Sequence, residues 1–167
     1  MPYKSDISTI GYKRLVDINM LCASGIMKTD KSIRNITIAA INRSAMDIDS
    51  WNHSRIADEN DTELIEKFEL SENELPVFEI KSEFAHTLIS TRQIIERNKE
   101  KLHSLNFDFL DGVVYGNFKG QPNKPKLSIF RVVDIHGDEL DFQMETGKAS
   151  IGLIYSVDTI RQLRADD

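Results

Sequence analysis

The residue pair best suited to chemistry in this sequence is Glu79 and Lys81, which lie two positions apart in the run Val77-Phe78-Glu79-Ile80-Lys81-Ser82. The apolar and β-branched residues of this run predict a strand over residues 75–81. Successive side chains of a strand point to opposite faces, so the carboxylate and the ammonium group share one face. They form a candidate site for ionic chemistry, or equally a solvent-facing cross-strand ion pair.

This segment resembles the metal-dependent nucleases of the PD-(D/E)xK type, in which a strand carries the Glu and the Lys and leads into a helix. The resemblance implies that Glu79 and an upstream Asp hold Mg²⁺ through oxygen ligands, while Lys81 assists the attacking water or the developing charge. The upstream acid would be Asp58 or Asp61. Gln93 would match a glutamine that some members carry in the helix. Magnesium is a cofactor under this hypothesis alone.

Arg97 and His103 carry a second resemblance. With Asn98 beside the arginine, they look like the R-x(4–6)-H signature of HEPN ribonucleases, in which the two side chains handle the scissile phosphate. That family is all helical and commonly dimeric. The alternative is a solvated helix face on which Arg97 and Lys101 lie one turn apart.

The acidic segment, residues 57–83, contains ten acidic residues and two lysines, a net charge of −8. The rest of the chain is also charged in blocks: residues 1–56 carry +3, 84–131 carry +4 and 132–167 carry −5. A dense acidic surface can steer and hold a basic protein partner, although it can also serve only to keep the chain in solution. The residues expected to contact the partner are Asp58, Glu59, Asp61, Glu63, Glu66, Glu69, Glu72 and Glu74.

The region from residue 115 to residue 130 combines lysines with aromatic residues. Phosphates need cations and bases need flat faces for stacking, so this composition is typical of single-stranded nucleic-acid binding. A loop rich in lysine and proline also protects a sheet from edge pairing, which is the alternative interpretation. The candidate nucleic-acid residues are Tyr115, Phe118, Lys119, Lys124 and Lys126.

Several helices are expected to position these residues. The apolar spacing predicts a first helix from Asp6 to Ser24 and favours a helix over a strand for residues 31–46, with Thr29 or Asp30 as its cap. Residues 47–60 are expected to form a loop anchored by Trp51. A long helix is predicted from Ser82 to Leu105, because a repeating four-then-three spacing gives it an apolar stripe. That stripe consists of Phe84, Leu88, Thr91, Ile95, Asn98, Leu102 and Leu105.

The pattern changes to strands after residue 105. Strands are predicted over residues 107–118, 127–135, 139–144 and 151–155, with His136-Gly137-Asp138 as a tight turn. Ser156 is expected to cap a final helix. The fold class is therefore α+β: a helical N-terminal half with a long helix over 82–105, then an antiparallel β-meander of about four strands and a C-terminal helix.

Length and composition are those of one ordinary globular domain. The 167 residues are 40% hydrophobic and 29% charged, and a possible subdivision separates residues 1–105 from 106–167. No apolar run approaches the length that spans a bilayer, and no secretory signal is apparent, so we expect a cytoplasmic protein with no membrane. Cys22 is the only cysteine. The four histidines are scattered, and no metal site is expected from them.

The leading hypothesis is a non-enzymatic protein-interaction module: a small acidic inhibitor, immunity or accessory protein that engages a basic partner through residues 57–83. The first alternative is a Mg²⁺-dependent nuclease that uses Glu79 and Lys81. The second is single-stranded nucleic-acid binding by residues 115–130. The sequence leaves the identity of the partner and the oligomeric state open.

Overall fold

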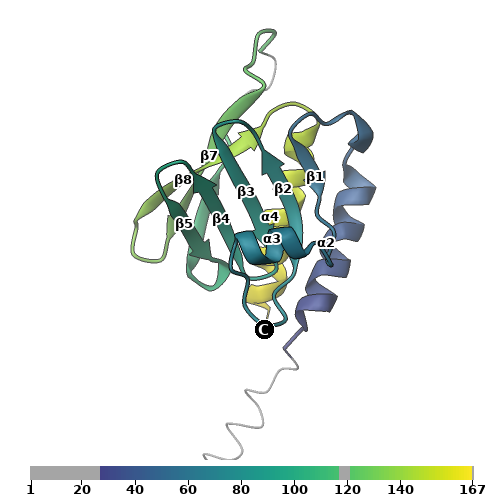
Figure 1. Cartoon of the computed structure of the whole chain (residues 1–167), viewed down its shortest axis with the longest axis vertical. Helices are drawn as coiled ribbons and strands as arrows, with labels where there is room; N and C mark the ends of the chain where they lie inside the picture. Colours follow the sequence, from purple (N-terminus) through teal and green to yellow (C-terminus); the bar gives the residue numbers. More distant parts are fainter. Residues whose placement is uncertain (1–26, 117–120, 167) are drawn as a thin grey trace, which may run out of the picture.

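The computed structural model describes residues 27–116 and 121–166. The protein is an α+β protein with an N-terminal helix, a five-stranded antiparallel meander, a three-stranded sheet and a C-terminal helix (Figure 1). The predicted helix over residues 6–24 lies outside the described residues. The elements are α2 (Asp30–Ser44), η1 (Ile48–Ser50), β1 (Ser54–Ile56), α3 (Thr62–Lys67), β2 (Pro76–Lys81), β3 (Ala85–Ser90), β4 (Gln93–Asn98), β5 (Leu102–Asn106), η2 (Phe107–Phe109), β6 (Leu110–Val114), β7 (Leu127–Asp134), β8 (Glu139–Glu145) and α4 (Ala149–Ala165).

The larger sheet has the order β1-β2-β3-β4-β5, with every neighbouring pair antiparallel. Figure 1 shows α3 in front of this sheet and α4 behind it. We call the face under α3 the outer face and the other the inner face. The smaller sheet has the order β6-β7-β8, also antiparallel.

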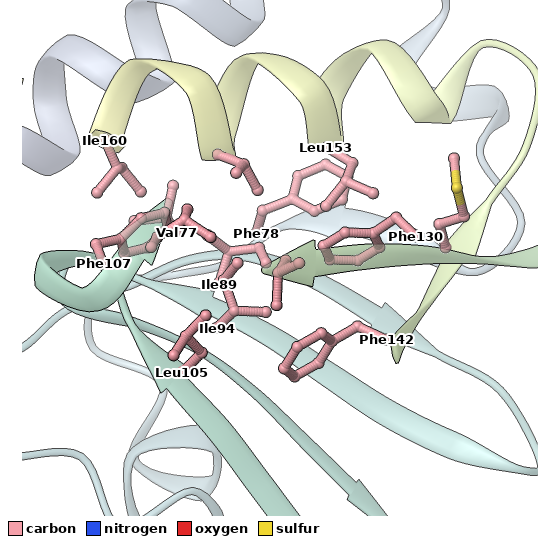
Figure 2. Close-up of a cluster of buried hydrophobic side chains, with 14 of the residues drawn as sticks. Val77, Phe78, Ile89, Ile94, Leu105, Phe107, Phe130, Phe142, Leu153 and Ile160 are labelled. Carbon is pink, nitrogen blue, oxygen red and sulfur yellow. The ribbon is translucent and has the colours of Figure 1, made fainter. Parts of the chain in front are cut away.

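The main hydrophobic core lies between the inner face, the small sheet and α4 (Figure 2). Phe78 and Ile89 come from the large sheet, Phe130 and Phe142 from the small one, and all four are fully buried. The rings of Phe130 and Phe142 stack with their centroids 5.6 Å apart. Leu153, Val157 and Ile160 of α4 close this core, because their three- and four-residue spacing places them on one helix face.

A smaller cluster holds α3 on the outer face. Leu64 and Phe68, at the two ends of one helical turn, pack with Leu88 of β3 and Ile95 of β4. Asp61 caps α3, because its side chain accepts a hydrogen bond from the backbone N–H of Leu64 at 3.1 Å. A helix of six residues is too short to be stable alone, so these contacts hold it in place.

The long helix predicted over residues 82–105 is wrong. The structure has β3, β4 and β5 there, joined by tight turns. Ser82 does accept hydrogen bonds from the backbone N–H groups of Phe84 and Ala85, the pattern of a helix cap, but it closes the turn between β2 and β3 instead. A serine that accepts hydrogen bonds from the next backbone N–H groups can therefore mark either the start of a helix or a tight turn.

The strand predicted over residues 151–155 is also wrong, since these residues belong to α4, and Ser156 lies inside the helix that it was expected to cap. The predicted strand over 107–118 is shorter, with η2 preceding β6. Residues 47–60 contain η1 and β1 as well as loop. The helix over 31–46 is confirmed by α2, which Thr29 caps by accepting from the backbone N–H of Ser32.

The remaining strand predictions are confirmed. Residues 75–81 contain β2, and the pair predicted over 127–135 and 139–144 is β7 and β8. The predicted turn between them contains Gly137 with φ of 87°, a conformation that glycine adopts without strain. Among the described residues, no helix is long and apolar enough to cross a membrane.

Candidate functional site

The acids of the acidic segment fall into two groups that differ in burial. One group is built into the scaffold: Glu59 forms an ion pair with Lys31, Asp61 pairs with Arg55 at 3.0 Å, and both acids are partly buried. The charge of Lys31 and its hydrogen bond hold the pKa of Glu59 below its usual value. These acids stabilise the contacts of α3 and β1 with their surroundings.

Glu74 belongs to the same group and is only 3% exposed. One carboxylate oxygen accepts from the backbone N–H of Ser71 at 2.9 Å, and the other accepts from Ser90 Oγ and from Gln93 Nε2. Its carboxylate therefore ties the loop before β2 to the turn between β3 and β4. With its oxygens turned into the protein, Glu74 contributes to the fold of the acidic surface and not to its exposed charge.

The second group is exposed. Most of its members lie on α3 and in the loop that follows, where a positive φ of 52° at Glu69 turns the chain out of the helix, while Asp58 lies between β1 and α3. The acids of this group are Asp58, Glu63, Glu66, Glu69, Glu72 and, in the turn after β2, Glu83. None of their side chains forms an ion pair with another residue in the described part of the chain.

Glu79 occupies the outer face of β2, where it is 4% exposed. Its Oε1 lies 2.9 Å from Nε2 of His86, and its Oε2 accepts from Nε of Arg55 at 2.7 Å. Burial by itself would raise the pKa of Glu79, but the hydrogen bond from His86 and the charge of Arg55 outweigh it and hold the pKa below its usual value. The carboxylate is thus ionised and bound on both oxygens.

His86 continues this network to α3. Its Nδ1 lies 2.7 Å from Nζ of Lys67. An ammonium group can only donate, so Nδ1 accepts and the ring proton lies on Nε2, from which it is donated to Glu79. The rings of Phe68 and His86 meet edge to face, with their centroids 4.9 Å apart. Both ring nitrogens are therefore used within the protein.

These contacts do not fit the magnesium site that the nuclease resemblance implies. Arg55 lies between Asp61 and Glu79 and supplies the positive charge that a cation would bring. Gln93 binds Glu74 at another part of the sheet, and Asp58 accepts from the backbone N–H of Asn60. Within residues 27–116 and 121–166, no group of three His, Cys, Asp or Glu side chains is arranged to hold a metal ion.

Arg97 and His103 do not share a site. In the pairing of β4 with β5, His103 lies opposite Glu96, the neighbour of Arg97, so the two side chains occupy opposite faces of the sheet. Arg97 Nη2 donates to the backbone carbonyl of Lys67 on the outer face. His103 Nε2 lies 3.0 Å from the backbone carbonyl of Asp141, towards β8. The strands that replace the predicted helix cause this separation.

The two described aromatic residues of the 115–130 region, Tyr115 and Phe130, are used in packing. Phe130 is fully buried, and Tyr115 stacks on it with centroids 6.0 Å apart. The Tyr115 hydroxyl donates to Asp158 at 2.9 Å, and burial together with that carboxylate raises its pKa. Lys124 and Lys126 are exposed. Phe118 and Lys119 lie outside the described residues.

Sequence reasoning missed the residues that surround Glu79 and Lys81. Register places His86 opposite Lys81 on one side and opposite Arg97 on the other, so three strands present these side chains together on the outer face. On the expected helix, His86 and Arg97 would have been about three turns apart. The signal that could have found them is the pair of apolar doublets, Leu88-Ile89 and Ile94-Ile95, on either side of a short polar turn.

A scan against protein-family models, a search of curated proteins and a search of solved structures found no match to this chain.

Proposed function

We propose that the protein is a non-enzymatic interaction module, of the inhibitor, immunity or accessory kind, that engages a basic protein partner through the exposed acids of residues 57–83. One observation carries this proposal: Glu63, Glu66, Glu69 and Glu72 are exposed and have no ion-pair partner within the described residues, whereas the acids beside them are paired or hydrogen-bonded. The segment thus carries negative charges that are not used in ion pairs within the described part of the fold.

The exposed glutamates lie on a helix and a loop that are both held in place by contacts with the rest of the protein. Leu64 and Phe68 are 3% and 2% exposed, which holds the opposite side of α3 against the sheet. The loop after α3 is held by Glu74, as described above. A surface that is already ordered before binding loses less conformational entropy in the complex, which favours affinity.

The expected partner surface is rich in lysine or arginine and binds faster at low ionic strength. Attraction between exposed charges steers encounter and is screened over roughly 8 Å at physiological salt. Complex formation should therefore weaken as salt rises. The glutamate side chains at the edge of the interface should affect mainly the association rate.

Two variants of equal net charge test the proposal. The first reverses Glu66, Glu69 and Glu72 to Lys, and the control reverses Asp49, Asp111 and Asp138, which are exposed acids outside the segment. Both variants move the net charge from −6 to neutrality. Partners captured from the native host at low salt are identified with the wild type, purified, and titrated against all three proteins.

The proposal expects the first variant to lose at least about tenfold in affinity, or roughly 1.4 kcal/mol, while the control binds like the wild type. Wild-type affinity should also fall steeply with salt. Equal binding by the wild type and the first variant would show that the acidic segment is not the interface. An equal loss in both variants would assign the effect to net charge alone.

A further inference from the structure

A shallow hollow of about 220 Å³ opens on the outer face of the large sheet, beside the turn between β2 and β3. Four basic side chains line it, together with one acid, Glu83. The basic residues come from four different elements or turns: Lys67 ends α3, Lys81 ends β2, Arg97 lies in β4 and Lys99 follows β4. The meander register brings them to one place.

These four cations have no carboxylate partner among the described residues. Lys67 Nζ donates to Nδ1 of His86, and Arg97 Nη2 donates to the backbone carbonyl of Lys67. The Nε of Arg97 is buried without a hydrogen-bond partner. The hollow therefore holds uncompensated positive charge, although the chain as a whole is acidic.

A second hollow, also of about 220 Å³, adjoins the first and shares Phe84, Asn98 and Lys99 with it. Its remaining lining residue is Glu100. Phe84 lies in the turn between β2 and β3 and is 67% exposed. Among the described phenylalanines it is the most exposed, and it leaves an aromatic ring open to solvent beside several cations.

From this arrangement we infer that the two hollows bind a nucleotide unit of a single-stranded nucleic acid. Lys67, Lys81, Arg97 and Lys99 supply the cations for a phosphate, and Phe84 supplies a face for a base. A cationic groove next to an aromatic platform is what sequence-tolerant binding of single strands requires. The hollow adjoins the exposed glutamates of α3 at Lys67 but uses none of them. The inference therefore goes beyond the proposed function and does not depend on it.

The test is fluorescence anisotropy of a labelled oligouridylate of about ten nucleotides, titrated with the full-length protein at low salt. The variants are Phe84→Ala, Phe84→Tyr and the double variant Lys81→Gln with Lys99→Gln. The controls are Phe109→Ala, the other exposed phenylalanine among the described residues, and Lys124→Gln with Lys126→Gln in the other basic loop. All of these side chains are exposed, and thermal melts verify that each variant folds.

We expect Phe84→Ala and the lysine double variant each to weaken binding by about tenfold, Phe84→Tyr to bind like the wild type, and both controls to leave binding unchanged. The lysine variant should also show a shallower dependence on salt than the wild type. Competition with free uridine monophosphate distinguishes a site for a free nucleotide from a site for a nucleic-acid strand. Displacement at matched nucleotide concentration indicates a free nucleotide, whereas much weaker competition indicates a strand.

Four results would overturn the inference. The first is a flat wild-type titration. The second is loss of binding in the Lys124 and Lys126 variant only, which would move the site to the 115–130 region. The third is unchanged binding in Phe84→Ala together with displacement by heparin, which would leave only a polyanion surface. The fourth is salt-sensitive self-association that the lysine variant abolishes, which would make the acidic segment of a second copy the occupant.

Discussion

The Nε2 of His86 lies 2.9 Å from Oε1 of Glu79, and both side chains are buried on the outer face of the sheet. The contact joins β2 to β3, and Lys67 and Arg55 extend it to α3 and β1. An ionised carboxylate in this position needs its partners, because an unpaired buried charge is costly. The network therefore links the stability of this face to the protonation of Glu79.

Replacing Glu79 by Gln should lower the free energy of unfolding at neutral pH by about 1–3 kcal/mol. The difference from the wild type should shrink as the pH falls. A carboxyl group whose folded pKa is depressed contributes stability that is present above its unfolded pKa, near the usual 4.5, and lost as the pH falls through the folded pKa. Urea unfolding at about pH 7 and about pH 3.5 measures both quantities.

Glu63→Gln is the control for this prediction, since Glu63 is exposed and has no ion-pair partner in the described part of the chain. Its unfolding free energy should match that of the wild type at both pH values. A gap between Glu79→Gln and the wild type that stays constant with pH would contradict the prediction, because the gap would then not arise from ionisation.

Elements whose apolar residues follow a single period, either that of a strand or that of a helix, were predictable from the sequence. In β7, buried Phe130 and Val132 alternate with exposed Ile129 and Arg131, which is the pattern of a strand with one face in the core. In α2, Thr29 provides a capping side chain where the helical spacing begins. Local chemistry and tertiary packing agree in both elements.

The 82–105 segment was not predictable in this way, because its first two strands are buried on both faces. Leu88 packs under α3 while Ile89 packs in the main core, and Ile95 and Ile94 divide in the same manner. Burial on both faces removes the alternation that marks a strand. The apolar residues of the segment then happen to fit a helical spacing. β-branched residues lower the helix propensity only slightly, so their presence does not exclude a helix.

The candidate sites likewise have features that local sequence patterns predict and features that depend on tertiary structure. That Glu79 and Lys81 share a face was predictable from alternation alone. Their surroundings depend on the strands that pair with and follow β2. Those strands form hairpins in the segment where a helix was predicted, so their side chains could not be placed beside Glu79 and Lys81. The burial of Glu74 among equally acidic neighbours has no local signal, since its partners Ser90 and Gln93 lie in a different turn.

The same substitution should destabilise the protein at Glu74 and leave its stability almost unchanged at Glu72. Glu74→Ala removes the acceptor for Ser71, Ser90 and Gln93 and should lower the free energy of unfolding by about 3 kcal/mol, since the buried Ser90 hydroxyl and two partly buried donors lose their partner. Glu72→Ala should change it by less than about 0.5 kcal/mol, because its side chain is exposed. Chemical denaturation of the two variants, compared with the wild type, measures the difference. Equal stability of the two variants would contradict the assignment of Glu74 to the scaffold.

Gly152 in α4 should not tolerate a side chain. A Cβ there would lie 2.7 Å from Cη2 of Trp51 and 2.8 Å from Cε2 of Phe78, so both rings would have to shift. Overpacking of this kind costs about 1–3 kcal/mol, which exceeds the gain of up to about 1 kcal/mol from replacing glycine by alanine in a helix. We expect Gly152→Ala to be destabilised, as measured by the emission of Trp51, the only tryptophan, during denaturation.

Gly112→Ala in β6 is the matched control, because its Cβ would find only Val133 Cβ, at an ordinary 3.9 Å. It should unfold within about 0.5 kcal/mol of the wild type. Trp51→Phe removes the ring atom nearest to the added methyl group, so the cost of Gly152→Ala should be smaller in that background, with stability followed by circular dichroism. An unchanged cost would show that Trp51 does not limit the space, and a neutral Gly152→Ala would contradict the close approach of α4 to β2.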